Sequence, residues 1–331
     1  MRPVSYSRVR DVATAIATVT ADAGAAYLAG GTTKVDMLRI YAEASQRLVD
    51  INDLPIDHIE VQPDGALRIG AMARMNDVAM APLVMDRFPV ISEALVLGAS
   101  AQLRNMASMG GNMLQRTRCT YFRDAEASCN KREPGTGCDA LTGVNRGHAV
   151  LGTSRYCIAT HPSDVAVALT ALDAVIHVQN TSGHHAYPID DFFLLPGATP
   201  QREHPLNHGD LITAIEVPAL PMGRNSLYLK VRDRESYEFA LSSAACALRV
   251  EGGEVAEVRL ALGGVATKPW RARRAERALL GQPATRESFA RAAAEEMSEA
   301  VAQPMNEFKI ELAQRTMVRA LETLAARGDV S

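Results

Sequence analysis

Four of the five cysteines in this 331-residue chain fall in one short stretch, shortly after the glycine pair Gly110-Gly111. They are Cys119, Cys129, Cys138 and Cys157. Thiolates gathered in this way usually hold a metal or a cluster, or form disulfides. The stretch lacks the closely spaced cysteine pairs that structural zinc sites and ferredoxins use. The spacing alone therefore favours zinc and an iron–sulfur cluster about equally, and disulfides less.

Two glycine-rich polar segments precede the cysteines. The first follows a predicted strand and opens a predicted helix, and it consists of Leu28, Ala29, Gly30, Gly31, Thr32, Thr33 and Lys34. Glycine lets the backbone approach an anion closely, and successive N–H groups at a helix start favour phosphate. The pattern is not GxGxxG, which disfavours a Rossmann dinucleotide site. A plain structural turn is the alternative.

The second segment runs from Ser100 to Asn112. Its Ser108 and Asn112 could bond a phosphate, a ribose or a ring edge, or could simply cap a turn. Two such segments in one N-terminal region favour a long cofactor that carries phosphate, but they do not identify it.

Basic residues accompany the cysteines. They would help to balance an anionic cluster, although a solvated basic loop is the simpler interpretation, and they are Arg116, Arg118, Lys131 and Arg132. The fifth thiol, Cys246, sits in an apolar run and is interpreted as a buried strand cysteine.

The overall composition excludes several classes of protein. A net charge of -3 gives no general attraction to nucleic acid or to an anionic membrane. No apolar run is long enough to span a bilayer. The N-terminus lacks the apolar core and small-residue cleavage site of a secretory signal, so export would need the signal of a partner.

The N-terminal half predicts alternating helices and strands that position the glycine-rich segments. Helices are expected at 10–21, 35–43, 76–81 and 88–98, and strands at 25–29, 47–51 and 66–73. Regular periodicity is lost from 115 to 155. A structureless stretch of this length needs something to hold it, and a metal cluster would offset the entropy of ordering it.

Regular elements return after the cysteines. Ser163 or Asp164 is expected to cap a helix at 165–174, followed by a strand at 175–179. Residues 180–210, with a histidine pair, are interpreted as a surface loop. Beyond a boundary near 220 we expect an α+β unit with a three-stranded antiparallel sheet. Its strands are predicted at 226–234, 242–250 and 257–265, and its helices at 269–280, 285–300 and 306–326.

Four segments carry a resemblance to a known family. In chain order they read LAGGTT, QLRNMASMGGN, HPSDVAVALTALDA and YLKVRDR. Together they resemble the FAD-binding (medium) subunit of the molybdenum hydroxylases, the xanthine dehydrogenase and carbon monoxide dehydrogenase group, over nearly the whole chain. The resemblance implies an α+β, vanillyl-alcohol-oxidase-like (PCMH-type) FAD-binding fold. Its two FAD-binding subdomains would span 1–55 and 56–220, and the C-terminal α+β domain 221–331.

The cysteine-rich insert, residues 115–158, resembles the flavoprotein subunits of three-subunit periplasmic aldehyde oxidoreductases of bacteria. In that subgroup the flavin subunit carries an additional [4Fe–4S] cluster. The resemblance implies that Cys119, Cys129, Cys138 and Cys157 are the ligands of such a cluster.

The family also implies where FAD would lie. Gly30 to Lys34 would hold the pyrophosphate, and the second segment would approach it through Ser108, Gly111 and Asn112. Leu28, Ala29, Ser100 and Arg104 are expected in the same site. Asp164 and Lys230 match positions at the flavin end.

The implied function is electron transfer, with no catalytic residue on this chain. A large partner subunit with a molybdenum cofactor would oxidise an aldehyde, and a small one with [2Fe–2S] clusters would pass electrons to FAD and on to an external acceptor. Periplasmic location by co-export with a partner is expected, with the cytoplasm as the alternative. A free-standing flavin oxidase with a zinc-stapled loop and a non-catalytic nucleotide-binding module are the competing functions.

Overall fold

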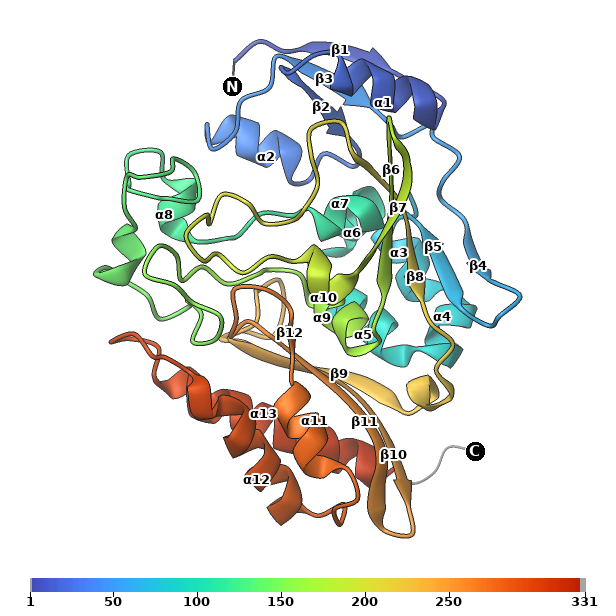
Figure 1. Ribbon diagram of the computed structural model, residues 1–331, viewed down its shortest axis with the longest axis vertical. Helices are drawn as coiled ribbons and strands as arrows, with labels where there is room; N and C mark the ends of the chain where they lie inside the picture. The colour runs from blue at the N-terminus through green and yellow to red at the C-terminus, as the bar shows by residue number, and fades with distance from the viewer. Residues whose placement is uncertain (1, 328–331) are drawn as a thin grey trace.

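Three β-sheets follow one another along the chain, and helices cover each of them (Figure 1). The computed structural model describes residues 2–327. The first sheet lies at the top of Figure 1, the second with its helices in the middle, and the C-terminal sheet at the bottom. The predicted α+β fold class is confirmed by this arrangement of elements.

The first sheet is parallel and delivers the first glycine-rich segment. Its strand order is β1-β3-β2, so the carboxyl ends of all three strands meet at one edge. Ala15, Ile16 and Val19 of α1 pack on Val49 of β3. The elements are β1 (Ser5–Arg8), α1 (Val12–Thr20), β2 (Ala25–Leu28), α2 (Lys34–Arg39) and β3 (Arg47–Asp50). The glycine-rich segment is therefore the turn from β2 into α2, as predicted.

The second sheet has five antiparallel strands in the order β4-β5-β8-β6-β7. They are β4 (Ile59–Val61), β5 (Leu67–Gly70), β6 (Val175–Asn180), β7 (Gly183–Pro188) and β8 (Leu211–Val217). Its helices are α3 (Met75–Met80), α4 (Pro82–Arg87), α5 (Pro89–Leu97), α6 (Ala101–Met106), α7 (Met109–Met113), α9 (Asp164–Ala171) and α10 (Ile189–Phe192).

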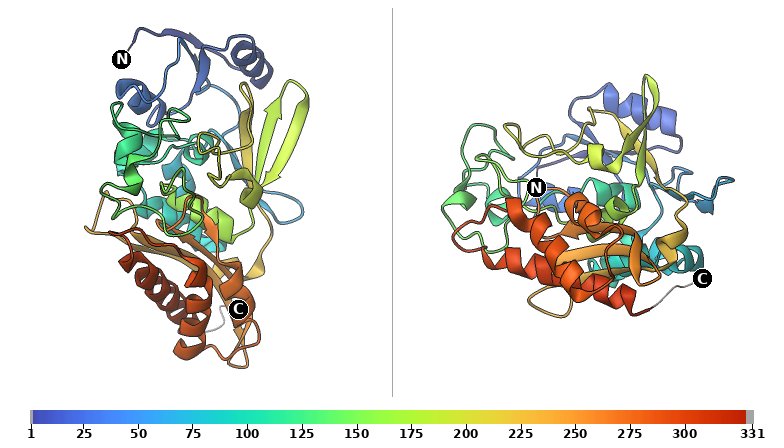
Figure 2. Two further views of the ribbon diagram at one scale, coloured as in Figure 1. Left: turned by 60° about the vertical axis from the view of Figure 1, so that its left-hand side comes forward. Right: turned by 60° about the horizontal axis from the view of Figure 1, so that its bottom comes forward.

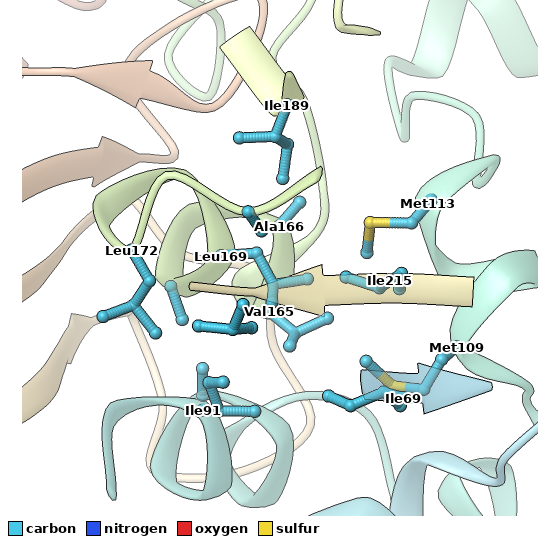
Figure 3. Close-up of a cluster of buried hydrophobic side chains, with 14 of the residues drawn as sticks. Ile69, Ile91, Met109, Met113, Val165, Ala166, Leu169, Leu172, Ile189 and Ile215 are labelled. Atoms are coloured by element: carbon cyan, nitrogen blue, oxygen red, sulfur yellow. The ribbon is translucent and has the colours of Figure 1, made fainter. Parts of the chain in front are cut away.

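Helix α9 lies at the centre of the main core. Val165 to Ala171 are all buried, which is the pattern of a helix that is covered on every side. Figure 3 shows Leu169 of α9 near Ile215 of β8, with Ile91 of α5 and Met113 of α7 around them. Ser163 caps α9 by accepting a hydrogen bond from the backbone N–H of Ala166 at 3.0 Å, so the predicted helix start is confirmed.

The prediction that residues 180–210 form a surface loop is wrong for its first part. Gly183–Pro188 form the edge strand β7, and Gly183 has the positive φ of 123° that the tight turn from β6 requires. The predicted loop histidines, His184 and His185, lie on this strand. An edge strand with mostly exposed side chains shows no apolar alternation, so its sequence resembles that of a loop.

The C-terminal sheet packs on both of its faces. Ala245 and Ala261 join the main core, whereas Cys246 and Leu260 face the C-terminal helices. Figure 2 shows these helices together on the side of the sheet away from the rest of the chain. Cys246 is fully buried, as its apolar run indicates. The elements are η2 (Pro221–Arg224), β9 (Ser226–Val231), β10 (Ser242–Glu251), β11 (Glu254–Gly263), β12 (Trp270–Arg271), α11 (Arg273–Leu279), α12 (Arg286–Glu296), η3 (Met297–Glu299) and α13 (Phe308–Ala325).

The prediction of a three-stranded C-terminal sheet is wrong by one strand. The strand order is β12-β11-β10-β9, and β12 pairs only Trp270 and Arg271 with β11. A strand of two residues is too short to show a periodic pattern of apolar residues. The helix that is expected from residue 269 begins only at Arg273.

The cysteine-rich insert is as irregular as predicted. Its short elements are α8 (Thr120–Arg123) and η1 (Asp139–Leu141). Single antiparallel bridges join Cys129 to Cys138 and Ser154 to Cys157. In Figure 1 the insert forms the green loops at one side of the molecule.

Candidate functional site

A cleft of about 1100 Å³ opens beside the two glycine-rich segments. Small-molecule sites usually measure about 300–1,000 Å³, so this cleft suits a large ligand. Most of the predicted cofactor-binding residues line it: Ala29, Gly30, Gly31, Thr32, Thr33, Lys34, Ser108, Gly111, Asn112, Asp164 and Lys230. The structure therefore gathers both segments and the two predicted flavin-end residues around one space.

Three of the predicted residues have structural partners instead. Leu28 ends strand β2. Ser100 caps α6 by accepting from the backbone N–H of Leu103 at 3.3 Å. Arg104 donates to the main-chain carbonyls of Val96, Gly98 and Ala99, and so closes the turn between α5 and α6. None of the three is among the residues that line the cleft.

Two residues that the sequence analysis does not name join the glycine-rich segments to each other. The Asn52 amide donates to the carbonyl of Ala29 at 3.0 Å. Arg74 donates from Nη2 to Asn52 Oδ1 at 2.8 Å and from Nη1 to the carbonyl of Met106 at 2.6 Å. A single arginine after β5 leaves no local pattern that would indicate these distant partners.

The second segment is built into the fold by its own polar groups. Ser108 is buried and caps α7 by accepting from the N–H of Gly111 at 3.2 Å. Asn112 accepts from Ser163 Oγ at 2.5 Å and donates to Met75 Sδ at 3.2 Å. These bonds fix the backbone of Gly110-Gly111 against the cleft.

A buried ion pair joins the C-terminal sheet to helix α9 at the cleft. Lys230 donates from Nζ to Asp164 Oδ2 at 2.8 Å, and Tyr228 donates to Asp164 Oδ1 at 2.7 Å. The side chain of Lys230 is 1% exposed and that of Asp164 is 10% exposed. Burial raises the pKa of Asp164 above its ordinary value although Lys230 opposes the shift.

The basic residues near the cysteines are paired, so the interpretation as a solvated loop is wrong for them. Arg116 bonds Glu43 at 2.9 Å and also contacts Glu203. Lys131 bonds Glu203 at 2.9 Å, and Arg118 lies 3.3 Å from Asp36 of α2. Arg132 donates to the carbonyls of Tyr121 and Phe122. The ion pairs of Arg116, Arg118 and Lys131 fasten the insert to residues that line the cleft, whereas the bonds of Arg132 lie within the insert.

Predicted Lys34 takes part in the same network. Its Nζ lies 2.7 Å from Glu43 Oε2, so Glu43 joins the first glycine-rich segment to Arg116 of the insert. Burial acts to raise the pKa of Glu43, but Lys34 and Arg116 outweigh it and hold the pKa below its ordinary value.

All four cysteines of the insert line one small hollow with a volume of about 10 Å³. Cys129 and Cys157 are buried, Cys119 and Cys138 half-buried, and each is a free thiol. Burial raises the pKa of Cys119 to about 12, and the neighbouring Cys129 and Cys157 add to the shift. The thiol of Cys119 is therefore protonated at neutral pH unless a metal replaces its proton.

Within residues 2–327, no three or more His, Cys, Asp or Glu side chains form a group that could hold a metal ion. The same part of the chain contains no helix with the length and apolar character of a membrane span.

Comparisons with known proteins match both halves of the structure. Residues 2–220 match the model of the FAD binding domain in molybdopterin dehydrogenase, and residues 227–324 that of the CO dehydrogenase flavoprotein C-terminal domain. The aldehyde oxidoreductase FAD-binding subunit PaoB of Escherichia coli is 44% identical, covering 99% of this chain and 100% of PaoB. The glyceraldehyde dehydrogenase medium chain of Sulfolobus acidocaldarius is 28% identical over 84% of this chain and 81% of its own length.

A solved structure agrees with these matches. In the carbon monoxide dehydrogenase of Hydrogenophaga pseudoflava, a chain that is 26% identical superposes with a TM-score of 0.76 and covers 99% of both chains. The chain described here therefore belongs to the FAD-binding medium subunits of the molybdenum hydroxylase (xanthine dehydrogenase) family and is an oxidoreductase subunit.

Proposed function

We propose that this chain is the FAD and iron–sulfur subunit of a three-subunit, molybdenum-dependent aldehyde oxidoreductase. The cleft carries the proposal, because both glycine-rich segments, Asp164 and Lys230 face one space of a size that suits a dinucleotide. The 44% identity to an aldehyde oxidoreductase subunit over the full chain supports the aldehyde class of substrate.

The residues at the cleft fit FAD at both of its ends. Gly30 and Gly31 present their backbone to the cleft without an intervening side chain, and Thr32, Thr33 and Lys34 line the cleft beside them, which suits a pyrophosphate. Asp164 and Lys230, fixed by their mutual bond, would orient the flavin end. When bound there, FAD would supply two-electron redox chemistry, and the protein would supply binding, orientation and electrostatics.

Aldehyde oxidation is assigned to a partner subunit. Asp164 and Lys230 are each other's hydrogen-bond partners in the cleft, which fits the binding and orientation of a cofactor. We therefore assign the aldehyde to a large partner with the molybdenum cofactor. A small partner with [2Fe–2S] clusters would pass electrons to this chain and then to an external acceptor. Co-export with a partner to the periplasm and the domain limits 1–55, 56–220 and 221–331 are part of the same proposal.

The hollow in the insert is proposed to hold a [4Fe–4S] cluster on Cys119, Cys129, Cys138 and Cys157. A single zinc ion needs all its thiolates about 2.3 Å away, whereas the four thiolates of a cluster bind different irons and stand farther apart. Four thiols line one hollow, which is the number of thiolates that such a cluster needs. Such a cluster would hold together an insert that has little regular structure of its own.

The test compares the isolated chain with the complex that is purified through an affinity tag on it. We expect the isolated chain to bind FAD whose absorption does not change when an aldehyde is added. In the complex, the same addition should bleach the flavin absorption. Aldehyde turnover by the isolated chain would support a free-standing flavin oxidase. A nucleotide-binding module would be supported by a chain without flavin in both preparations.

A further inference from the structure

Among the described residues of the insert, His148 is the one non-cysteine side chain with a hydrogen-bond contact to a cysteine sulfur. Its Nε2 lies 3.2 Å from the Sγ atom of Cys119, and the residue is 7% exposed. The other ring nitrogen, Nδ1, is buried and has no hydrogen-bond partner. Cys119 is thus contacted by a polar group that the proposed ligation does not use.

The surroundings of the ring decide which nitrogen carries the hydrogen. A hydrogen on Nδ1 would be a buried donor without an acceptor, which costs about 1–3 kcal/mol. A hydrogen on Nε2 points at the sulfur of Cys119 instead. The neutral ring is therefore expected to be protonated on Nε2 and to donate to the sulfur.

The backbone of His148 is held by the C-terminal domain. Lys309 of α13 is fully buried and donates from Nζ to the carbonyls of Gly147 at 3.1 Å, His148 at 3.0 Å and Gly264 at 2.6 Å. Asn306 donates to the carbonyl of His148 at 3.2 Å. Among residues 2–327 no carboxylate pairs with Lys309, and burial lowers the pKa of Lys309 to about 7, so the three carbonyls are what hold its side chain beside the insert.

We propose that His148 donates a hydrogen bond from Nε2 to the thiolate of Cys119 in the iron-loaded protein, and that Lys309 is the residue that positions it. This inference rests on the cluster proposed above. An N–H donor withdraws negative charge from the sulfur, so it weakens the iron–thiolate bond slightly and stabilises the reduced cluster. Adding one electron to the cluster moves no proton, and the hydrogen stays on Nε2.

The experiment is resonance Raman spectroscopy of the iron–thiolate stretching bands in the purified complex. His148→Leu removes the donor, and His148→Gln keeps an N–H near the position of Nε2. His161→Leu is the matched control, because His161 is a partly buried histidine whose ring packs edge-on against Phe193. We expect the Leu variant at position 148 to shift the bands upward and to lose the wild-type response to D₂O. The Gln variant and the control should resemble the wild type.

A redox titration gives the second readout. The Leu variant at position 148 should be harder to reduce by about tenfold in the one-electron equilibrium constant, which is about 59 mV. Iron-loaded Leu and wild-type proteins with identical bands would overturn the inference and leave the cluster in place. If the Leu variant loses its iron, the Gln variant decides: iron with wild-type bands supports the inference, and loss of iron overturns it. A wild-type protein without iron would instead refute the cluster itself.

Discussion

Gly30 lies so close to the main-chain carbonyl of Met106 that a Cβ atom on Gly30 would stand 1.8 Å from that oxygen. The same carbonyl accepts a hydrogen bond from Arg74. The two glycine-rich segments, one after β2 and the other containing α6, are therefore in direct contact and form one wall of the cleft. Only glycine allows this approach of the two backbones.

Replacing Gly30 by alanine should push the two segments apart. Overpacking of this kind costs about 1–3 kcal/mol, and we expect FAD to bind at least about tenfold more weakly. A fluorescence titration with FAD measures the change. Gly147→Ala is the matched control, because a Cβ at Gly147 would meet nothing within 4 Å. Unchanged affinity in the Gly30 variant would show that the contact with Met106 does not shape the site.

Replacing Lys230 by methionine should leave the buried carboxylate of Asp164 without its ion-pair partner. Removing one partner of a buried ion pair costs about 3–5 kcal/mol, because the other charge is left without compensation. Since burial already raises the pKa of Asp164, the variant should take up a proton at this residue. Urea unfolding measures the loss of stability.

An exposed ion pair provides the control for Lys230. The side chains of Arg224 and Asp86 are 53% and 64% exposed, and Arg224→Met should cost no more than about 1 kcal/mol. Adding Asp164→Asn to the Lys230 variant should recover part of the lost stability. Equal costs for the Lys230 and Arg224 variants would contradict the buried role of the pair.

The attachment of the insert should weaken in acid. Burial acts to raise the pKa of Glu203, but Lys131 and Arg116 outweigh it and hold the pKa below the ordinary 4.5. The stabilisation by Glu203 is therefore complete above pH 4.5 and is lost as the pH falls through the lower folded-state value. Glu203→Gln should cost about 1–3 kcal/mol near neutrality.

Thermal unfolding at several pH values tests this dependence. The difference in melting temperature between the wild type and the Gln variant should be constant above pH 4.5 and should shrink below it. A difference that grows in acid would mean that the pKa of Glu203 is raised in the folded protein, contrary to the pairing with Lys131.

The sequence predicts the parts of the structure that local pattern determines. The turn from β2 into α2 and the helix at Pro89–Leu97 are both confirmed. The central strand Leu211–Val217 is not predicted, because it owes its burial to β5 and β6, which lie far away in the sequence. The roles of Asn52 and Arg74 are not predicted either, because their hydrogen-bond partners also lie in distant segments.

The cysteine set shows how a family resemblance and local pattern differ in what they predict. The spacing of the cysteines alone favours zinc and an iron–sulfur cluster equally. The loss of hydrophobic periodicity predicts only that the segment is irregular. The structure adds that the thiols line one hollow and that Arg116 and Lys131 are paired with Glu203. Those ion pairs join residues that are distant in the sequence, so the sequence offers no sign of them.

The central claim is tested most directly by measuring FAD and metal per chain in the wild type, in Cys129→Ser and in Cys246→Ala. We predict one FAD and about four irons in the wild type and in the Ala variant, whose buried thiol lies in the C-terminal sheet. The Ser variant should keep FAD and lose most of its iron. Zinc in place of iron, or iron that is unchanged by Cys129→Ser, would contradict the account.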